Sequence, residues 1–395
     1  MRRLYSYLIL FFAINLANAQ IQLSNFAEVS VLTIGPGTAL NDAFGHSAIR
    51  IKDPMYKLDA VFDYGRYDFE AEGFYLNFAK GKLTYEIGWA NYAAFIEHYK
   101  SVEREVKSQT INLNSTEKQL LFQMLQRNIQ PQNKSYSYDF FYNNCATKIK
   151  DAFETVCDET IVYNEPTTFE PLTFRALIRS KVAQNSWGGF GIDLALGSLI
   201  DQVASAEEHM FLPKNIDNFF QEAKFQNSQE PLVKKQEVLS ATQTTLPSIF
   251  WMSPLFIFGL LSLLLIVQTY RDFKRNSRAR WLDFSIFTIT GGIGVVILLL
   301  WFATNHSATA YNYNFLWAFA FNLLMIPTTL KKSVKKRFIG YLKFLILLLL
   351  LVLLHWCTGV QSFNIALIPI WLGLMIRYAY LCIWCNNHLS HIDTP

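Results

Sequence analysis

The chain has 395 residues, of which 51% are apolar and 17% are charged, with a net charge of +4. The charged fraction lies below the ~25% of ordinary soluble proteins, which argues against a wholly soluble chain. The basic residues cluster beside apolar runs, so they do not form a nucleic-acid-binding surface. The apolar excess begins after residue 246, and the part before it is long enough to bury a core of its own.

The N-terminus has the three parts of a secretory signal. Met1-Arg2-Arg3 is positively charged, and the apolar run LYSYLILFFAINLANA that follows ends in Ala-Asn-Ala. This pattern predicts a signal peptide over residues 1–19, cleaved before Gln20. An uncleaved anchor is the alternative. Residues 20–225 are then expected to be an exported domain, and because no cysteine stands at the cleavage point, we do not expect the chain itself to be a lipoprotein.

Several strands are predicted in the first part of the exported region. The runs are 26–34, FGHSAIRI at 44–51, AVFDYG at 60–65 and KLTYEIGWA at 82–90. A helix is predicted over 115–128. Strands mixed with helices in this way indicate an α+β domain with an antiparallel sheet. His46 lies at the start of the second strand, beside Gly45, which allows a close backbone approach.

The segment YNNCATKIKDAF at 142–153 places Cys145 on a polar turn just before a helical pattern. A cysteine is a nucleophile only as its thiolate, which a helix N-terminus and a nearby imidazole both favour. Asn143 and Asn144 are placed to cap the helix or to donate into an oxyanion hole. We therefore predict that Cys145 and His46 form a thiol–imidazole site.

Cys145 and Cys157 are the two cysteines of the exported part, which raises the question of a disulfide. Twelve helical residues separate their Cα atoms by ~18 Å. A disulfide needs a Cα separation of ~4.4–6.8 Å. The sequence therefore predicts that Cys145 is a free thiol and that Cys157 is buried filler.

A second helical region is expected from about 170 to 225, broken by the WGGFG cluster at 187–191. The stretch 226–246 is polar and has few residues that could join a core, so it is expected to be a linker to the membrane.

The second part of the chain predicts a transmembrane domain, residues 247–386, followed by a short tail at 387–395. Five apolar runs lie at 248–269, 282–303, 313–330, 340–358 and 365–385. Each is close to the ~20 residues that cross the hydrocarbon core. With the first domain exported, both basic loops fall on the cytoplasmic side, as the positive-inside rule requires. The C-terminus is then cytoplasmic.

Four polar residues near the membrane are candidates for contact with substrate. His306, Asn312 and Asn314 follow the second span on the outer side, either as an interfacial loop or as a membrane-side part of the site. Arg377 falls midway through the last span, where a cation costs ~2.5–3.5 kcal/mol. It is expected to reach the interface, an anionic headgroup or a partner within the bundle.

The order of His before Cys resembles the permuted NlpC-type thiol fold, a papain-like fold in which the histidine strands come first. More closely, the chain is similar to the bacterial lipoprotein N-acyltransferase family of the Lnb type. The resemblance rests on FGHSAIRI, FDYGRYDF (62–69), GKLTYEI, YSYDFFYNNCATKIKD, GIDLALGSLID, MFLP and HSATAYNYNFLW (306–317). It covers most of the chain, spans included.

The resemblance also implies a third, orienting group. In a permuted thiol fold this group lies on the strand after the histidine strand, where Asp63 stands at a position that favours Asn in the family. Tyr64 is the neighbouring candidate. The alternative is that Asp63 caps a turn beside Gly65.

The family resemblance implies that an acyl chain moves from the diacylglyceryl group of a lipoprotein to the amine of its N-terminal cysteine, leaving a lyso-form lipoprotein. Cys145 would carry the thioester, His46 would transfer protons, and Asn144 or backbone N–H groups would receive the oxyanion.

The implied partners are diacylated lipoproteins or phospholipid acyl donors, at the inner membrane of a bacterium. No metal, cofactor or nucleic acid is expected. The alternatives are a cysteine peptidase or amidase acting on cell-wall peptides, a thiol phospholipase, and a non-catalytic envelope scaffold.

Overall fold

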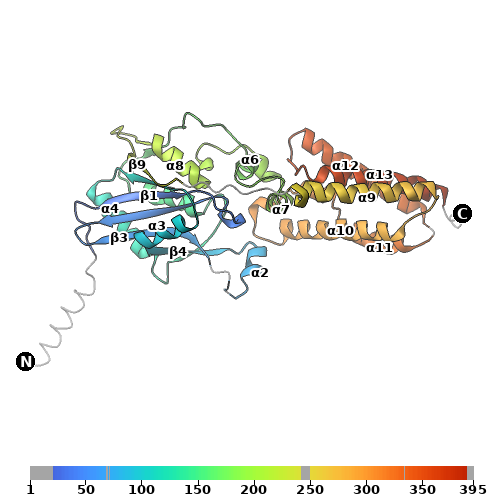
Figure 1. The fold of residues 1–395 in the computed structure, drawn as a ribbon, viewed down its shortest axis with the longest axis horizontal. Helices are drawn as coiled ribbons and strands as arrows, with labels where there is room; N and C mark the ends of the chain where they lie inside the picture. The colour runs from blue at the N-terminus through green and yellow to red at the C-terminus, as the bar shows by residue number, and fades with distance from the viewer. Residues whose placement is uncertain (1–20, 68–69, 71, 242–249, 333, 389–395) are drawn as a thin grey trace, which may run out of the picture.

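A computed structural model of the protein describes residues 21–67, 70, 72–241, 250–332 and 334–388 (Figure 1). The predicted signal peptide and nearly all of the predicted tail lie outside these residues. The described part consists of a sheet domain, a set of short connecting helices and a helical membrane domain, in chain order.

The sheet domain contains a seven-stranded antiparallel sheet with the order β6-β4-β3-β2-β1-β5-β9. The four strands predicted from the sequence are confirmed as β1, β2, β3 and β4. Three more, β5, β6 and β9, were not predicted. The bounds are β1 Glu28–Ile34, β2 His46–Asp53, β3 Leu58–Arg66, β4 Thr84–Asn91, β5 Val106–Ile111, β6 Ser135–Ser137 and β9 Val233–Ser240.

Helices cover both faces of this sheet. On one face α4 (Ser115–Asn128), α5 (Cys145–Val156) and α8 (Pro213–Glu222) pack on the larger core cluster. On the other face α3 (Tyr92–Ser101) packs on a smaller cluster around Leu32, Ala48 and Val61. The α+β prediction is confirmed, with the Cys145 helix on one face of the sheet.

The predicted linker 226–246 is wrong for its central part, because Val233–Ser240 forms β9 at the edge of the sheet, paired with β5. Its side chains are largely charged and exposed, as in many edge strands, where charge discourages pairing with other chains. A strand of this composition looks like a polar linker in the sequence, which is why the prediction missed it. Just before it, β8 (Lys224–Phe225) pairs with β7 (Ile161–Val162).

Short helices connect the sheet domain to the membrane domain (Figure 1). The expected break at 187–191 is wrong, because these residues lie within α7. A Cβ on Gly189 would come within 2.3 Å of the Ala183 carbonyl oxygen, so glycine permits a close approach there. The elements are α6 Phe174–Arg179, α7 Trp187–Ala195 and the 3-10 turns Ser198–Asp201 and Glu208–Phe211. Two more 3-10 turns lie elsewhere, at Leu40–Asp42 and Phe250–Met252.

The membrane domain has, within the described residues, four helices long and apolar enough to cross a membrane. They are α9 Pro254–Lys274, α10 Arg280–Phe302, α12 Lys336–Cys357 and α13 Leu367–Asn387. The predicted span at 313–330 is not one such helix: it consists of a 3-10 turn, Tyr313–Leu316, and the nine-residue α11, Asn322–Leu330. A further 3-10 turn, Ser307–Thr309, precedes it.

Glycines in α10 explain how an irregular segment fits into the membrane domain. A Cβ on Gly294 would lie 2.0 Å from the Ala318 carbonyl oxygen, and one on Gly291 would lie 2.8 Å from Leu323. The non-helical backbone therefore packs directly on α10, inside protein, which is where a bilayer tolerates it. The apolar composition predicted a crossing, and the tight packing made it partly non-helical.

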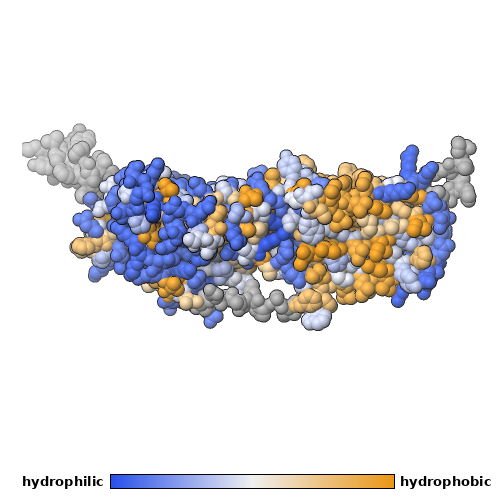
Figure 2. Space-filling model, turned by 90° about the horizontal axis from the view of Figure 1, so that it is seen from above, coloured by the Kyte–Doolittle hydropathy of each residue, from blue (hydrophilic) through white to orange (hydrophobic). Residues whose placement is uncertain are grey.

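The basic segments that follow α9 and α11 lie at one end of the membrane domain. Arg278 donates to the Thr329 carbonyl at 2.9 Å, and Arg280 donates to the Leu330 carbonyl at 2.8 Å. The surface in Figure 2 agrees, since a hydrophobic zone separates the hydrophilic sheet domain from a hydrophilic far end.

Candidate active site

The candidate site lies where two neighbouring strands separate. The ladder between β2 and β3 runs from Asp53↔Leu58 to Ile49↔Phe62 and ends there. The rest of β2, from His46 to Ala48, pairs with β1 alone. The diverging ends carry His46 and Asp63, and the N-terminus of α5 reaches the same place, because a Cβ on Gly65 would lie 3.5 Å from the Cβ of Cys145.

Cys145 is the first residue of α5 and is half-buried as a free thiol. The prediction that it forms no disulfide is confirmed, because the helix carries Cys157 away from it. Within the described residues, the Cys145 backbone N–H donates to no protein acceptor, whereas its neighbours at Ala146 and Thr147 donate to the Asn144 side chain. One helix N-terminal donor is therefore free beside the sulfur.

His46 lies between the thiol and a carboxylate. Its Nε2 is 3.2 Å from Asp63 Oδ2, and its side chain is 18% exposed. Cys145 lies close enough to the ring to raise the pKa of His46, through its charge and as a hydrogen-bond partner. Because Nε2 faces Asp63, Nδ1 is the nitrogen available to the sulfur. The structure thus brings His46, Asp63 and the start of the Cys145 helix to one place.

Asp63 is shared between His46 and a residue that the sequence analysis did not select. Arg66 Nε donates to Asp63 Oδ1 at 2.9 Å, and its terminal nitrogen donates to the same oxygen at 2.5 Å. Gly88 on the neighbouring strand β4 makes room for this, because a Cβ there would lie 2.4 Å from the guanidinium carbon. Arg66 therefore fixes the carboxylate whose second oxygen faces the imidazole.

The charges in this cluster shift two pKa values in opposite directions. Burial lowers the pKa of His46, but the negative charge of Cys145 and the Asp63 hydrogen bond outweigh burial and hold it well above 6.5. Burial raises the pKa of Asp63, but the bonds from His46 and Arg66 outweigh it and the net shift is downward. The arrangement thus favours a protonated imidazole beside an ionised Asp63 carboxylate.

Two tyrosines from the segment before Cys145 complete the wall of the site. Burial and the charge of Cys145 raise the pKa of both Tyr136 and Tyr138. The Tyr136 hydroxyl is buried, makes no full hydrogen bond within the described residues, and is approached by the Gly65 backbone N–H. A Cβ placed on Gly65 would lie 4.0 Å from the Tyr136 hydroxyl and 3.5 Å from the Cys145 Cβ. The hydroxyl and Cys145 therefore both lie beside Gly65.

The structure gives two other predicted site residues different contacts. Asn144 caps α5 with its oxygen, and its amide nitrogen donates to the carbonyls of Phe140 and Phe211. No side-chain donor of Asn144 is left for an oxyanion. Tyr64 points into the core on the other face of β3, where its hydroxyl accepts from Asn128 at 2.8 Å.

The membrane-side candidates mostly hold the two domains together. Asn312 donates to the Leu194 carbonyl at 2.8 Å, and Asn314 donates to the Asp193 carbonyl at 3.3 Å. Both asparagines are buried, so they connect the membrane domain to α7. His306 contacts a different part of the sheet domain, because its Nε2 lies 2.8 Å from the Phe78 carbonyl oxygen.

Arg377 is fully buried in the membrane domain, far along α13 from its outer end. It pairs with Asp272 at 2.7 Å and with Asp283 at 2.8 Å. Arg278, from the basic loop, pairs with Asp283 at 2.6 Å. Of the three expectations for Arg377, the structure therefore has the third, a partner within the bundle. The two partner carboxylates lie at the end of the bundle opposite the sheet domain.

Sequence reasoning missed Arg66, Gly88, Tyr136 and Tyr138. A signal for the tyrosines was available, since YSY in the segment before Cys145 puts two rings on one side of a short strand. Arg66 gave no such signal, because its bond to Asp63 depends on the bulge between Tyr64 and Arg66.

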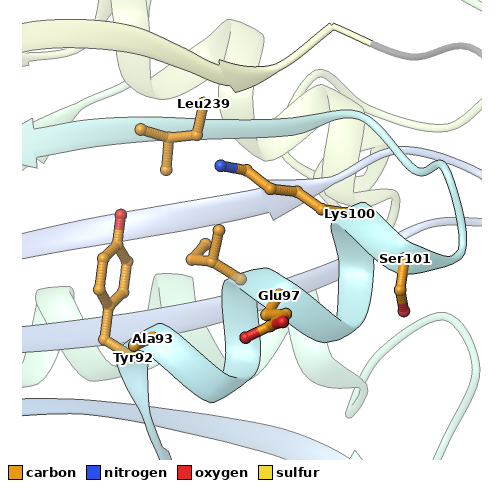
Figure 3. Close-up of a pocket in the computed structure, with 7 residues that line it drawn as sticks. Tyr92, Ala93, Glu97, Lys100, Ser101 and Leu239 are labelled. Atoms are coloured by element: carbon orange, nitrogen blue, oxygen red, sulfur yellow. The ribbon is translucent and has the colours of Figure 1, made fainter.

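Two other kinds of site were compared with this cluster, a metal site and a groove on the sheet domain. Among the described residues, no group of three or more His, Cys, Asp or Glu side chains could hold a metal ion. A shallow groove of about 720 Å³ lies between α3 and Leu239 of β9, lined by Tyr92, Glu97 and Lys100 (Figure 3). It lies on the face of the sheet opposite α5 and contains no predicted site residue.

The fold and the site together define a membrane protein whose α+β domain carries a Cys-His-Asp cluster. Two family models match the chain: the Lnb N-terminal periplasmic domain over residues 14–180 and the Lnb transmembrane domain over residues 245–388. Searches of curated proteins and of solved structures gave no match.

The two matched ranges together cover more than half of the chain, and the protein belongs to the Lnb family of lipoprotein N-acyltransferases. It is a membrane enzyme of lipoprotein processing, with its N-terminal domain in the periplasm and its helical domain in the inner membrane.

Proposed function

We propose that the protein transfers an acyl chain from a glycerolipid ester to the α-amino group of a lipoprotein's N-terminal cysteine, through a thioester on Cys145. The observation that carries this proposal is that His46 bonds Asp63 at 3.2 Å at the place where the start of α5 brings Cys145 against β3. A thiolate beside an oriented imidazolium is the arrangement that covalent acyl transfer requires.

In the first step, the Cys145 thiolate attacks the carbonyl carbon of the ester and a C–S bond forms. The carbonyl oxygen becomes an oxyanion. In this proposal the Cys145 N–H and the Tyr136 hydroxyl donate hydrogen bonds to it. When this intermediate collapses, the C–O bond breaks, and the alkoxide leaves with the proton of His46. The products are the Cys145 thioester and a lysolipid alcohol.

In the second step, the α-amino group of the lipoprotein attacks the thioester carbonyl. Neutral His46 takes the proton of the amine, the C–S bond breaks, and the amide product leaves. The thiolate and the imidazolium are then restored. Asp63 keeps Nε2 of the ring occupied, so that the same nitrogen, Nδ1, gives and takes the proton.

The connection between the domains favours a lipid donor over a cell-wall peptide. Buried side chains from the membrane domain, among them Asn312, Asn314 and Asn364, bond to α7 and to the residues around it. The periplasmic domain is thus joined to the membrane domain by many contacts, whereas a peptidase needs one anchor at most. Whether the donor is the diacylglyceryl group of the lipoprotein or a phospholipid is an outcome of the test.

The test is mass spectrometry of lipoprotein N-termini in cells that carry the wild-type protein or Cys145→Ala as the sole copy. N-acylated termini are expected with the wild type and free amines with Cys145→Ala. A product with one remaining O-linked chain identifies the lipoprotein as donor, and a product with two identifies a phospholipid. N-termini that are equally acylated in both strains would remove acyl transfer as the function.

A second measurement separates the alternatives. The purified wild-type protein incubated with phospholipid and a diacylated lipopeptide should carry a fatty acyl thioester that hydroxylamine releases. A thioester resolved only by water would favour a phospholipase, whereas cleavage of cell-wall peptides without a thioester of fatty acid would favour a peptidase or amidase.

A further inference from the structure

A series of ring contacts extends from the segment before Cys145 to the outer end of a membrane helix. Tyr138, in the segment that leads into the Cys145 helix, stacks on Tyr85 with ring centroids 4.1 Å apart. The contacts continue from Tyr85 to Tyr67 at 5.0 Å, from Tyr67 to Phe74 at 6.0 Å and from Phe74 to Phe78 at 6.2 Å. The last two rings belong to the short helix α2, Phe74–Ala79.

Backbone contacts fasten α2 to the membrane domain. The His306 ring bonds the Phe78 carbonyl at 2.8 Å, and the Asn305 N–H donates to the Lys80 carbonyl at 2.8 Å. Gly81 has a φ of +69°, and a Cβ there would lie 2.7 Å from the His306 nitrogen. In Figure 1, α2 accordingly projects from the sheet domain toward the membrane helices.

Two large apolar side chains of α2 are exposed. Leu76 is 58% exposed, and Phe78, whose ring also meets the His306 ring, is 49% exposed. At the same end of the membrane domain, other large apolar side chains are exposed, among them Phe250, Trp251, Phe302 and Tyr311. Exposed aromatic residues at the ends of membrane helices mark the membrane–water interface. The apolar side of α2 therefore lies at the level of the outer leaflet.

Charge near α2 fits the surface of a phospholipid leaflet. Lys80 and Lys82 follow the helix and are both exposed. Lysines beside an apolar interfacial segment extend their ammonium groups to the headgroup level while their stems stay on apolar surface. Anionic phosphates lie at that level.

We propose that Leu76 and Phe78 of α2 insert into the outer leaflet of the inner membrane, and that the ring series from Phe78 to Tyr138 guides an acyl chain of a phospholipid from that leaflet to Cys145. The inference rests on the proposed function and adds the membrane-contacting element and the route of the donor. Apolar and aromatic side chains are what lines binding sites for such chains.

The experiment uses the full-length protein in nanodiscs of phosphatidylethanolamine and phosphatidylglycerol. Leu76→Asp and Phe78→Asp are compared with Met55→Asp, a control that changes an equally exposed apolar residue in the turn at the opposite end of β2. The rate of Cys145 acylation from nanodisc lipid is measured beside that from p-nitrophenyl acetate, a water-soluble ester.

We expect the two α2 variants to lose about tenfold or more in acylation from lipid, because a factor of ten corresponds to about 1.4 kcal/mol, less than the burial of one Leu or Phe side chain contributes. Their rates with p-nitrophenyl acetate should equal that of the wild type, since the Cys-His-Asp cluster is untouched. Met55→Asp should leave both rates unchanged.

A photo-crosslinking amino acid at position 76 tests the leaflet contact without any reaction at the thiol. Crosslinks to phospholipid are expected there, and none when the same amino acid replaces Met55. Absence of lipid crosslinks at position 76, or wild-type acylation from lipid in both α2 variants, would overturn the inference while the proposed function stands. Lipid crosslinks from the photo-crosslinking amino acid at position 76, together with a wild-type protein that forms no thioester with either ester, would keep the leaflet contact and reject the acyl-transfer function.

Discussion

At the scale of single residues, Asp63 connects the two halves of the charge arrangement. One of its oxygens faces His46 at 3.2 Å and the other accepts both bonds from Arg66. A neutral Asn in this place, as the family resemblance suggests, would orient the ring equally well. The carboxylate adds charge that favours the imidazolium, and Arg66 keeps that carboxylate ionised in a buried place.

Asp63→Asn tests this charge directly. Because the pKa of His46 is raised above 6.5, the protonated ring stabilises the fold below that pH, and this contribution is lost as the pH rises through the raised value. Without the carboxylate, the raised pKa falls. We expect the alkaline limb of the acylation rate to move to lower pH, with a rate loss of about 10²-fold or more.

The measurement for this variant is the pH profile of Cys145 acylation by a soluble ester. Asp59→Asn is the matched control, since Asp59 lies on the same strand and pairs with an arginine, Arg50, outside the site. An alkaline limb that stays in place in Asp63→Asn would mean that the carboxylate does not act on His46.

The Tyr136 hydroxyl gives a second prediction at this scale. Tyr136→Phe removes a buried hydroxyl that makes no full hydrogen bond within the described residues and is approached by the Gly65 N–H, so the stability of the fold should change little. If the hydroxyl receives the oxyanion, the acylation rate falls by about 10²–10³-fold. Tyr64→Phe is the control, because the neighbouring Tyr64 ring packs on Tyr136 at 5.9 Å while its hydroxyl bonds to Asn128.

The control Tyr64→Phe should show the opposite pattern, a modest loss of stability with an unchanged rate of Cys145 acylation. Acylation and thermal unfolding of both variants decide the matter. Equal rates in Tyr136→Phe and the wild type would leave the Cys145 N–H as the oxyanion donor of the proposal.

At the scale of elements, the start of α5 places the sulfur. Asn144 accepts from the N–H groups of Ala146 and Thr147 and donates to the carbonyls of Phe140 and Phe211. The two accepted bonds cap the first turn of the helix, and the two donated bonds fix that turn against the segments of Phe140 and Phe211. The residue that the sequence suggested as an oxyanion donor is therefore a positioning residue for Cys145.

Asn144→Ala should cost more than an ordinary helix cap. Loss of the cap costs about 1 kcal/mol, and the two carbonyls that lose their donor add about 1–3 kcal/mol. Asn114→Ala, at the similarly capped start of α4, should cost about 1 kcal/mol alone. Denaturant unfolding gives both values, and alkylation of Cys145 by iodoacetamide should slow in Asn144→Ala alone. Equal losses in the two variants would contradict the positioning role.

The elements around the site differ in how well the sequence predicts them. β1 to β4 and α5 are predictable because their apolar residues follow the periods of a strand or a helix. β9 is not, because an edge strand with exposed charged side chains has the composition of a linker. The divergence of β2 from β3, where the site lies, has no local signal in the sequence.

At the scale of the whole molecule, buried polar contacts hold the periplasmic domain on the membrane domain. Arg175 pairs with Asp193 and Asp201, and Asp193 also accepts from Asn364 in the outer loop of the membrane domain. Gly197 lies in the same interface, where a Cβ would come within 1.8 Å of the Ala310 carbonyl oxygen. These contacts join the two domains through buried charged, polar and backbone groups.

Gly197→Ala should force this interface apart, because the atom it meets belongs to the backbone and cannot move aside. We expect a loss of about 1–3 kcal/mol in stability, and slower acylation from lipid than from a soluble ester. Gly191→Ala, in α7, meets no atom within 4 Å and should be neutral or slightly stabilising. Thermal unfolding in detergent compares the two, and an unaffected Gly197→Ala would show that the domains are less tightly packed than the contacts indicate.

Arg377 illustrates why the membrane residues were hard to assign. Composition alone showed a cation in a span, and its partners Asp272 and Asp283 lie about a hundred residues earlier. Asn312 and Asn314 are comparable, since their acceptors are backbone carbonyls of α7, which no sequence pattern marks.

The sequence by itself determined the export signal and apolar spans that we predict, the α+β class of the first domain and the pairing of a histidine strand with a cysteine helix. These depend on composition and periodicity, which are local. Only the tertiary structure decided that Asn144 positions the helix, that Arg66 and Tyr136 join the cluster and that α2 reaches the membrane domain. Most of those contacts join segments distant in the chain, and the short-range bond of Arg66 to Asp63 depends on the bulge in β3. Their energies come from burial and geometry that exist once the chain has folded.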